Sequence, residues 1–388
     1  MIRRTAREAL IRLAGQFPVI GITGPRQSGK TTLAQLTFPD KKYVTFDDQA
    51  MRTLAEANPS DFLMAFPDGA IIDEAQKVPE IFDALKLVVD QGPFEPGKYI
   101  LTGSSQFRLR ENMNESMAGR AAFLTLLPLS IQELKGAGRL PGNPYDFIYG
   151  GQYPPLYDDA KHFLTDDWYE SYIDTYLDLD VKDQIRPENL SVFKKFIKIC
   201  ALHSGQLLSM NSISKQVGVA QPTIKSWLSI LEMSYIIHFL EPDSSNLGKS
   251  LVKTPKLYFV DTGLLCHLLR LESKEDLLLS PYKGGAVETL AVSELLKNRY
   301  NAGKKPELTF YRDATGFEVD VIADWKKTFA IEVKSSNAPE RKLSANTRKY
   351  LELRGDETAC NQVFYLGDTT MSINGTEYVS WKDWGAVN

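Results

Sequence analysis

The segment from Gly24 to Thr32 constrains this chain more than any other. It reads Gly-Pro-Arg-Gln-Ser-Gly-Lys-Thr-Thr and so completes the phosphate-loop pattern G-x-x-x-x-G-K-[ST]. An apolar run of strand length, residues 17–22, precedes it, and residues 32–36 read as the start of a helix. A strand, a glycine-rich loop and a helix in this order predict an α/β domain that holds phosphate on backbone N–H groups and a helix N-terminus.

We predict that every residue of this loop takes part in nucleotide binding. The predicted residues are Gly24, Pro25, Arg26, Gln27, Ser28, Gly29, Lys30, Thr31 and Thr32. The lysine of the pattern reaches the β- and γ-phosphates, and the hydroxyl after it ligates Mg²⁺. ATP and Mg²⁺ are therefore the expected cofactors. The alternative is a glycine-rich turn that binds nothing.

Polar residues follow two further predicted strands. Residues 70–75 read Ala-Ile-Ile-Asp-Glu-Ala, so an apolar strand ends in Asp73, expected in the Mg²⁺ shell beside Thr31, and Glu74, expected to polarise the attacking water. Residues 98–105 end in Thr-Gly-Ser-Ser, and we predict that Ser104, with Thr102 as second choice, touches the γ-phosphate or the water. A simple glycine-containing turn is the alternative there.

Arginines add two further features to this half. Residues 107–118 read as a helix that ends at Gly119-Arg120, and a strand follows over 121–127. An arginine in this place can stabilise transition-state charge on a neighbouring subunit's nucleotide, which predicts a homo-oligomer. A surface or helix-terminus charge is the alternative for Arg120. A stripe of arginines on an expected N-terminal helix reads as a solvated face, and it consists of Arg3, Arg4, Arg7 and Arg12.

In this order the motifs resemble those of an AAA+ ATPase. The phosphate loop, with Ile72-Asp73-Glu74-Ala75-Gln76 and Leu101-Thr102-Gly103-Ser104-Ser105, more narrowly resembles one prokaryotic family. Its members join a P-loop AAA+-type ATPase domain to a C-terminal PD-(D/E)XK nuclease-like domain of uncertain function. The resemblance covers nearly the whole chain. We expect an ATPase domain over residues 1–135, a middle segment over 136–250 and a nuclease-like domain over 251–388.

The middle segment begins with a stretch rich in Gly and Pro, residues 136–155, which reads as a loop or linker. Helical patterning returns at Thr165 and again from Leu190 to Ala201. A short helix over 212–217, a turn at Gly218 and a helix from Gln221 then resemble a winged helix-turn-helix, whose second helix can enter a DNA major groove. The candidates for contact with double-stranded or branched DNA are Gln221, Thr223, Lys225 and Ser226. A lid or a partner-binding surface is the alternative.

Charged residues in the last third form a second candidate site. The strand patterns Phe-Glu-Val-Asp-Val-Ile (317–322) and Ala-Ile-Glu-Val-Lys (330–334) each put their charged side chains on one face. With Glu288 on an apolar helix face, the order resembles a PD-(D/E)XK centre in an α/β restriction-endonuclease-like domain. Asp320 and Glu332 would hold Mg²⁺ or Mn²⁺, Glu288 would complete the shell, and Lys334 would orient or activate water. The alternative is a fold relic without activity.

Composition limits the partners. The net charge of −4 does not indicate a nucleic-acid-binding protein, so any contact with DNA would need a local basic patch. The cysteines are widely separated, and no apolar run reaches membrane-spanning length, so we expect a cytoplasmic protein without a membrane partner. The leading hypothesis is Mg²⁺-dependent ATP binding and hydrolysis coupled to a nucleic-acid-binding or nuclease-like module. The alternative is an ATP-controlled protein-interaction switch with an inactive nuclease-like domain.

Overall fold

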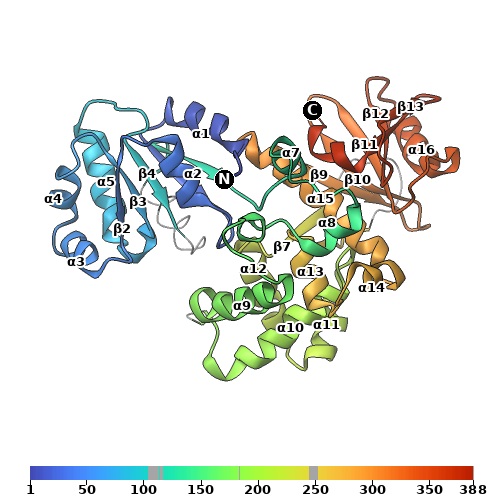
Figure 1. The fold of residues 1–388 in the computed structure, drawn as a ribbon, viewed down its shortest axis with the longest axis horizontal. Helices are drawn as coiled ribbons and strands as arrows, with labels where there is room; N and C mark the ends of the chain where they lie inside the picture. Colours follow the sequence, from blue (N-terminus) through green and yellow to red (C-terminus); the bar gives the residue numbers. More distant parts are fainter. Residues whose placement is uncertain (104–112, 114–116, 183, 244–251, 388) are drawn as a thin grey trace. The chain divides into compact units, whose positions relative to one another are not determined.

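The computed structural model describes residues 1–103, 113, 117–182, 184–243 and 252–387 (Figure 1). The chain forms two compact units. The N-terminal unit consists of Arg3–Pro128 with Arg299–Lys304, and the C-terminal unit consists of Met1–Ile2, Leu129–Asn298 and Lys305–Asn388. Both units mix helices with a sheet, as an α/β chain should.

The N-terminal unit is built on a parallel sheet with the strand order β2-β3-β4-β1-β5. Its strands are β1 (Val19–Thr23), β2 (Lys42–Thr45), β3 (Ala70–Asp73), β4 (Tyr99–Thr102) and β5 (Ala121–Thr125). Parallel strands bury both faces and read as continuous apolar runs, and β1 is buried at every position. All carboxyl ends of these strands lie at one edge of the sheet, where polar residues from separate motifs can meet.

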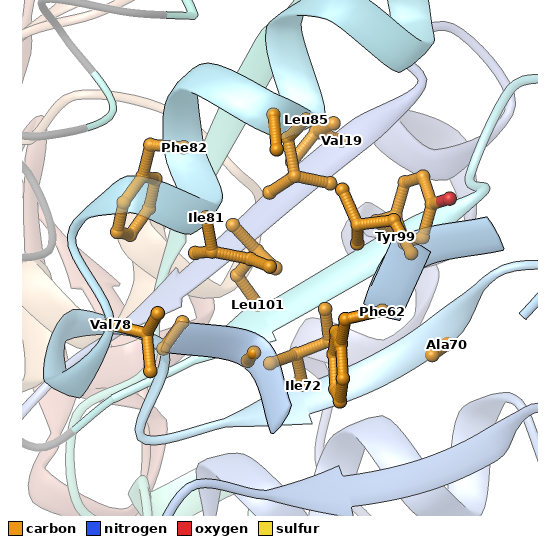
Figure 2. Close-up of a cluster of buried hydrophobic side chains, with 14 of the residues drawn as sticks. Val19, Phe62, Ala70, Ile72, Val78, Ile81, Phe82, Leu85, Tyr99 and Leu101 are labelled. Atoms are coloured by element: carbon orange, nitrogen blue, oxygen red, sulfur yellow. The ribbon is translucent and has the colours of Figure 1, made fainter. Parts of the chain in front are cut away.

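Helices cover both faces of this sheet because successive strand residues point to opposite sides. On one face, α1 (Ala6–Ala14) and α2 (Lys30–Thr37) pack on a core that includes Ile71. On the other face, Ile72 belongs to a second core, shown in Figure 2. The helices of that second face are α3 (Gln49–Ala57), α4 (Pro59–Met64) and α5 (Glu80–Gln91), with a 3₁₀ turn η1 (Ala75–Lys77) after β3.

The C-terminal unit contains one mixed sheet with the order β13-β14-β12-β11-β10-β9-β7-β8-β6. Its strands are β6 (Gln206–Leu207), β7 (Ile237–Pro242), β8 (Lys256–Phe259), β9 (Leu308–Arg312), β10 (Glu318–Asp324), β11 (Thr328–Lys334), β12 (Cys360–Tyr365), β13 (Met371–Ile373) and β14 (Thr376–Ser380). Strands β7 and β9 run parallel, with Glu241 opposite Thr309. The predicted boundary after residue 250 therefore falls between two strands, β7 and β8, that pair with each other.

Helices surround this sheet and supply the middle segment. They are α7 (Ile131–Gly136), α8 (Pro144–Gly150), α9 (Thr165–Tyr176), α10 (Leu190–Leu202), α11 (Met210–Val217), α12 (Gln221–Met233), α13 (Thr262–Leu268), α14 (Lys274–Leu279), α15 (Lys283–Asn301) and α16 (Ala345–Arg354). Shorter turns are η2 (Pro154–Tyr157), η3 (Leu177–Val181), η4 (Pro187–Asn189), η5 (Arg341–Ser344) and η6 (Trp381–Ala386). The helices expected from Thr165 and Leu190 are present.

The prediction of a loop or linker over residues 136–155 is wrong for helix α8. The side chain of Asn143 caps this helix by accepting a hydrogen bond from the Tyr145 N–H at 2.8 Å. Pro144 stands in the first turn, where its fixed φ favours the helix and its missing N–H costs nothing. Phe147 and Ile148 are buried, so packing holds a short helix in a segment whose composition suggests none.

Candidate functional site

The phosphate loop lies where the sequence predicts it, between the end of β1 and the start of α2. The chain takes up left-handed backbone conformations at Gly24 (φ 140°), Gln27 (φ 59°) and Gly29 (φ 91°). A Cβ atom at Gly24 would stand 2.0 Å from the carbonyl oxygen of Leu126, so only glycine fits there. The loop is therefore held tightly against β5 and its exit.

Lys30 rests on its own loop. Its buried ammonium donates hydrogen bonds to the carbonyl oxygens of Gly24 and Pro25, each at 2.8 Å. These neutral carbonyls hold the ammonium at the mouth of the loop, and phosphate oxygens are stronger acceptors for it. The predicted phosphate-binding lysine is thus placed at the predicted loop.

The structure brings Thr31 and Asp73 together at the carboxyl edge of the sheet. The hydroxyl of Thr31 donates to Oδ2 of Asp73 at 3.1 Å, although the two residues lie 42 positions apart. Thr102, the second choice on β4, donates to Oδ1 of the same carboxylate. Three neighbouring motifs of the sequence therefore converge on one acidic group.

Tyr43 is a residue of this site that the sequence analysis missed. Its hydroxyl, on the edge strand β2, donates to Oδ2 of Asp73 at 2.9 Å. Burial, and then the negative charge of Asp73, raises the pKa of Tyr43 to about 12, so the phenol stays neutral and keeps its proton for this bond. The signal was available, because Tyr43 stands two residues before the Thr45 that pairs with Asp73 in the sheet.

Glu74, the predicted water-polarising residue, follows Asp73 in a strained conformation. Its backbone is left-handed, with φ 54° and ψ 36°, which is uncommon for a residue with a side chain. The amide nitrogen of Gln76 donates to Oε2 of Glu74 at 2.5 Å. Gln76 belongs to the same sequence motif as Glu74, and no role was predicted for it. In the structure its side chain contacts the carboxylate that is predicted to be catalytic.

Arg4 also contacts the loop, which makes the prediction of a solvated arginine stripe wrong at this position. Its guanidinium is buried and donates to the carbonyl oxygens of Ser28 and Leu127, each at 2.6 Å. Arg4 lies two residues before α1, and its side chain reaches from there to the loop. Arg4 therefore holds the phosphate loop through the carbonyl oxygen of Ser28, a contact that no local sequence pattern predicts.

Of the other predicted catalytic residues of this unit, Arg120 is not brought to this site. Ser104 lies outside the described residues. Arg120 immediately precedes β5, at the amino edge of the parallel sheet, whereas the phosphate loop follows β1 at the carboxyl edge. It forms a bidentate ion pair with Asp90 of α5. A role for Arg120 on a neighbouring subunit stays a prediction.

In the C-terminal unit, three predicted site residues meet on β10 and β11. The ammonium of Lys334 donates to Oε1 of Glu332 at 2.6 Å, so the two share a face as the period of the strand predicts. Oδ2 of Asp320 accepts from the N–H of Val333 at 2.8 Å. The other carboxylate oxygen of Glu332, Oε2, is buried and has no protein donor among the described residues.

Glu288, from α15, is paired with a lysine that the sequence analysis missed. Lys256 of β8 is almost fully buried, and its Nζ lies 2.9 Å from Oε1 of Glu288 and 2.5 Å from Oε1 of Glu318. Arg312 pairs with the second oxygen of Glu318 at 2.9 Å. We call these residues, with Asp320, Glu332 and Lys334, the carboxylate cluster.

Burial and mutual repulsion perturb this cluster. Burial, and then the charge of Asp320, raises the pKa of Glu288 and of Glu332 to about 7. Burial would lower the pKa of Lys334, but Glu332 and Asp320 outweigh it and raise that pKa. Lys334 therefore keeps its proton at neutral pH and can orient a water molecule but not deprotonate it. Over the described part of the chain, no group of three or more His, Cys, Asp or Glu side chains is arranged to hold a metal ion.

The candidate DNA-contacting residues lie on α12, which follows α11 after a left-handed turn at Gly218 (φ 88°). Gln221, Lys225 and Ser226 are exposed and Thr223 is partly exposed. The opposite face of α12 is buried through Ile224, Trp227, Leu228 and Leu231. The exposed residues of α12 therefore include one lysine, one glutamate (Glu232) and neutral polar groups.

Comparison with known protein families identifies a domain in the N-terminal part of the chain. Residues 16–135 match a family described as "AAA domain". Residues 144–275 match a domain of unknown function (DUF8612), and residues 283–384 match another domain of unknown function (DUF4143). Together with the phosphate loop, the first match shows a P-loop ATPase domain of the AAA type, a fold that supports ATP binding and hydrolysis.

Relatives are found along most of the chain. It is 29% identical over 342 residues to the uncharacterized protein Rv2008c of Mycobacterium tuberculosis, covering 87% of this chain and 75% of that protein. The uncharacterized protein Mb2031c of Mycobacterium bovis matches to the same extent. Among solved structures, the Walker-type ATPase PABY2304 of Pyrococcus abyssi is similar with a TM-score of 0.44 and 14% identity, over 68% of this chain and 94% of that one. Within the described residues, no helix is long and apolar enough to cross a membrane.

Proposed function

We propose that the N-terminal unit binds ATP with Mg²⁺ at the carboxyl edge of its sheet and hydrolyses the γ-phosphate. The observation that carries this proposal is the meeting of Thr31 and Asp73 beside the phosphate loop. A hydroxyl and a carboxylate are the oxygen donors that Mg²⁺ prefers, and with phosphate oxygens they form the usual shell. Mg²⁺ at these residues would neutralise charge on the β- and γ-phosphates.

The protein's own groups would share the remaining work. Lys30 exchanges the carbonyl oxygens of Gly24 and Pro25 for phosphate oxygens, and the loop N–H groups hold the rest of the phosphate chain. Tyr43 and Thr102 keep the Asp73 carboxylate in place by donating to it. Glu74 orients the attacking water and accepts its proton as the water oxygen bonds to the γ-phosphorus and the bond from that phosphorus to ADP breaks. The proposal is supported by the position of β1, β3 and β4, whose carboxyl ends lie at the same edge of the sheet.

We further propose that turnover is coupled to a nucleic-acid-binding module made of α11, α12 and the paired strands β7 and β8. In this reading they form a winged helix-turn-helix whose exposed α12 face meets double-stranded or branched DNA. Lys225 would contact phosphate, while Gln221 and Ser226 would reach base edges. The reduced state expected of the cysteines agrees with a cytoplasmic setting.

A second function is favoured by the carboxylate cluster. Its carboxylates are Glu288, Glu318, Asp320 and Glu332, and its cations are Lys256, Lys334 and Arg312. Three cations face the four carboxylates, and Glu288 and Glu332, whose pKa is raised to about 7, can take up protons, so the described cluster can balance its charge without a divalent ion. This observation favours a homo-oligomeric, ATP-controlled interaction switch whose nuclease-like domain is inactive.

A nuclease centre would instead hold Mg²⁺ or Mn²⁺ on Glu288, Asp320 and Glu332. The buried Oε2 of Glu332, which lacks a protein donor among the described residues, is the atom that fits a metal ligand. Calorimetry with Mn²⁺ separates the two readings. Binding that disappears in Asp320→Ala supports the nuclease-like centre, and no binding to the wild type supports the switch.

The ATPase proposal is tested by turnover with and without single- and double-stranded DNA, with light scattering in the same samples. Lys30→Ala should abolish turnover, whereas Glu74→Gln should bind ATP and turn it over slowly, because only water activation is lost. Stimulation by DNA supports the coupled module, and ATP-dependent assembly without a DNA effect supports the switch. Wild-type turnover by Lys30→Ala would refute the site.

A further inference from the structure

The backbone at Glu74 is strained where the proposed chemistry occurs. For a residue with a Cβ atom, the left-handed region is disfavoured relative to the right-handed one. The conformation is held by the turn that follows, in which the N–H of Lys77 donates to the carbonyl oxygen of Glu74 at 2.9 Å. A strained backbone persists only where the surrounding structure fixes it. Here the fixed backbone sets the direction in which the Glu74 side chain leaves the chain.

Gln76 fixes the other end of the same side chain. It is 5% exposed, and its Nε2 donates to Oε2 of Glu74 at 2.5 Å. The assignment of the two amide atoms is physically determined, because a carboxylate only accepts and so the nitrogen must face it. A donor at this distance restricts the carboxylate to one orientation.

One atom of the Gln76 side-chain amide is unfavourable for the stability of the fold. Its Oε1 is buried and finds no donor among the protein groups that the structure describes. Burying a polar atom without a donor is destabilising, and a leucine or methionine of similar size would avoid this loss. Simple packing of the 3₁₀ turn η1 therefore does not account for a glutamine here, whereas holding Glu74 does.

We propose that Gln76 is the positioning residue of the ATPase site, which holds the Glu74 carboxylate in the orientation that activates water. This inference rests on the proposed function and adds to it a group whose role needs no contact with nucleotide or metal. Gln76 acts through Glu74, because its side chain donates to that carboxylate. Its loss should lower kcat and leave nucleotide affinity unchanged.

The test uses Gln76→Leu, which keeps the size of the side chain and removes the donor. We expect kcat to fall roughly 10- to 100-fold, a part of the effect of a general base, while the Kd for a fluorescent ATP analogue stays within about threefold. Gln91→Leu is the matched control, because Gln91 is an exposed glutamine at the end of α5 in the same unit. That control should retain wild-type kcat.

A double-mutant cycle separates positioning from structure. In a Glu74→Gln background, Gln76→Leu should have no further effect on kcat, since the group it positions is already gone. Multiplying effects of the two substitutions would overturn the proposal, as would an unchanged kcat in Gln76→Leu. If Gln76→Leu fails to fold, Gln76→Met repeats the cycle with a flexible side chain. A wild type without turnover would instead overturn the proposed ATPase function.

Discussion

Replacing Lys256 by methionine tests whether the carboxylate cluster is stabilised by its own lysine. The ammonium is 3% exposed and lies 2.9 Å from Glu288 and 2.5 Å from Glu318. Glu318 keeps Arg312 as a partner after the change, at 2.9 Å. Glu288, whose side chain is 18% exposed, would lose the cation that the structure gives it.

The expected cost follows from this asymmetry. Removing one partner of a buried ion pair leaves an uncompensated charge and destabilises by roughly 3–5 kcal/mol. With a urea m-value of about 3 kcal/mol/M, the unfolding midpoint should fall by ~1 M or more. Adding Glu288→Gln to Lys256→Met should recover part of that loss, because the second change removes the unpaired carboxylate.

Tryptophan fluorescence suits this measurement. All five tryptophans lie in the C-terminal unit, so the signal reports on that unit alone. Lys342→Met is the matched control, because this lysine is 79% exposed and pairs with a Glu340 that is 48% exposed. The control midpoint should not move. A Lys256→Met midpoint equal to that of the control would show that Lys256 does not hold the cluster together.

Two further outcomes are expected. Because the pKa of Glu332 is raised to about 7 from its ordinary 4.5, the folded state binds this proton more tightly than the unfolded state. The stability of the protein should therefore fall as pH rises from about 4.5 to about 7. In EDTA, Glu332→Gln should show a shallower fall in Tm across that range than the wild type. Arg120→Ala should keep ATP affinity and lose most turnover, and mixing it with Lys30→Ala subunits should restore activity by completing one shared site. A mixed oligomer without any rescue would count against a role for Arg120 in trans.

Local sequence patterns predicted the parts of the site that follow from strand and loop order. The phosphate loop between β1 and α2 is one example, and the approach of Thr31 to Asp73 is another, because parallel strands bring their carboxyl ends to one edge. The face shared by Glu332 and Lys334 follows from the period of a strand alone. These relations depend on neighbours in sequence or on adjacent strands.

The residues that sequence reasoning missed act across longer distances. Arg4 reaches the carbonyl oxygens of Ser28 and Leu127, which no periodicity connects to an N-terminal helix. Lys256 of β8 meets Glu288 of α15 32 positions later in the chain, through a contact between a strand and a helix that no sequence motif connects. Helix α8 was missed because its glycines and prolines outweigh, in composition, the cap and the buried aromatic residues that form it.

The mixed sheet of the C-terminal unit limits how its domains can be exchanged during evolution. Strands β7 and β8 come from the segment 144–275, and their neighbour β9 comes from the segment 283–384, so two separately matched domains share one hydrogen-bonded sheet. Exchanging one domain alone would leave an open strand edge, which promotes aggregation. We expect these two segments to pass between genomes as a pair, whereas the described strands of the ATPase segment pair only among themselves.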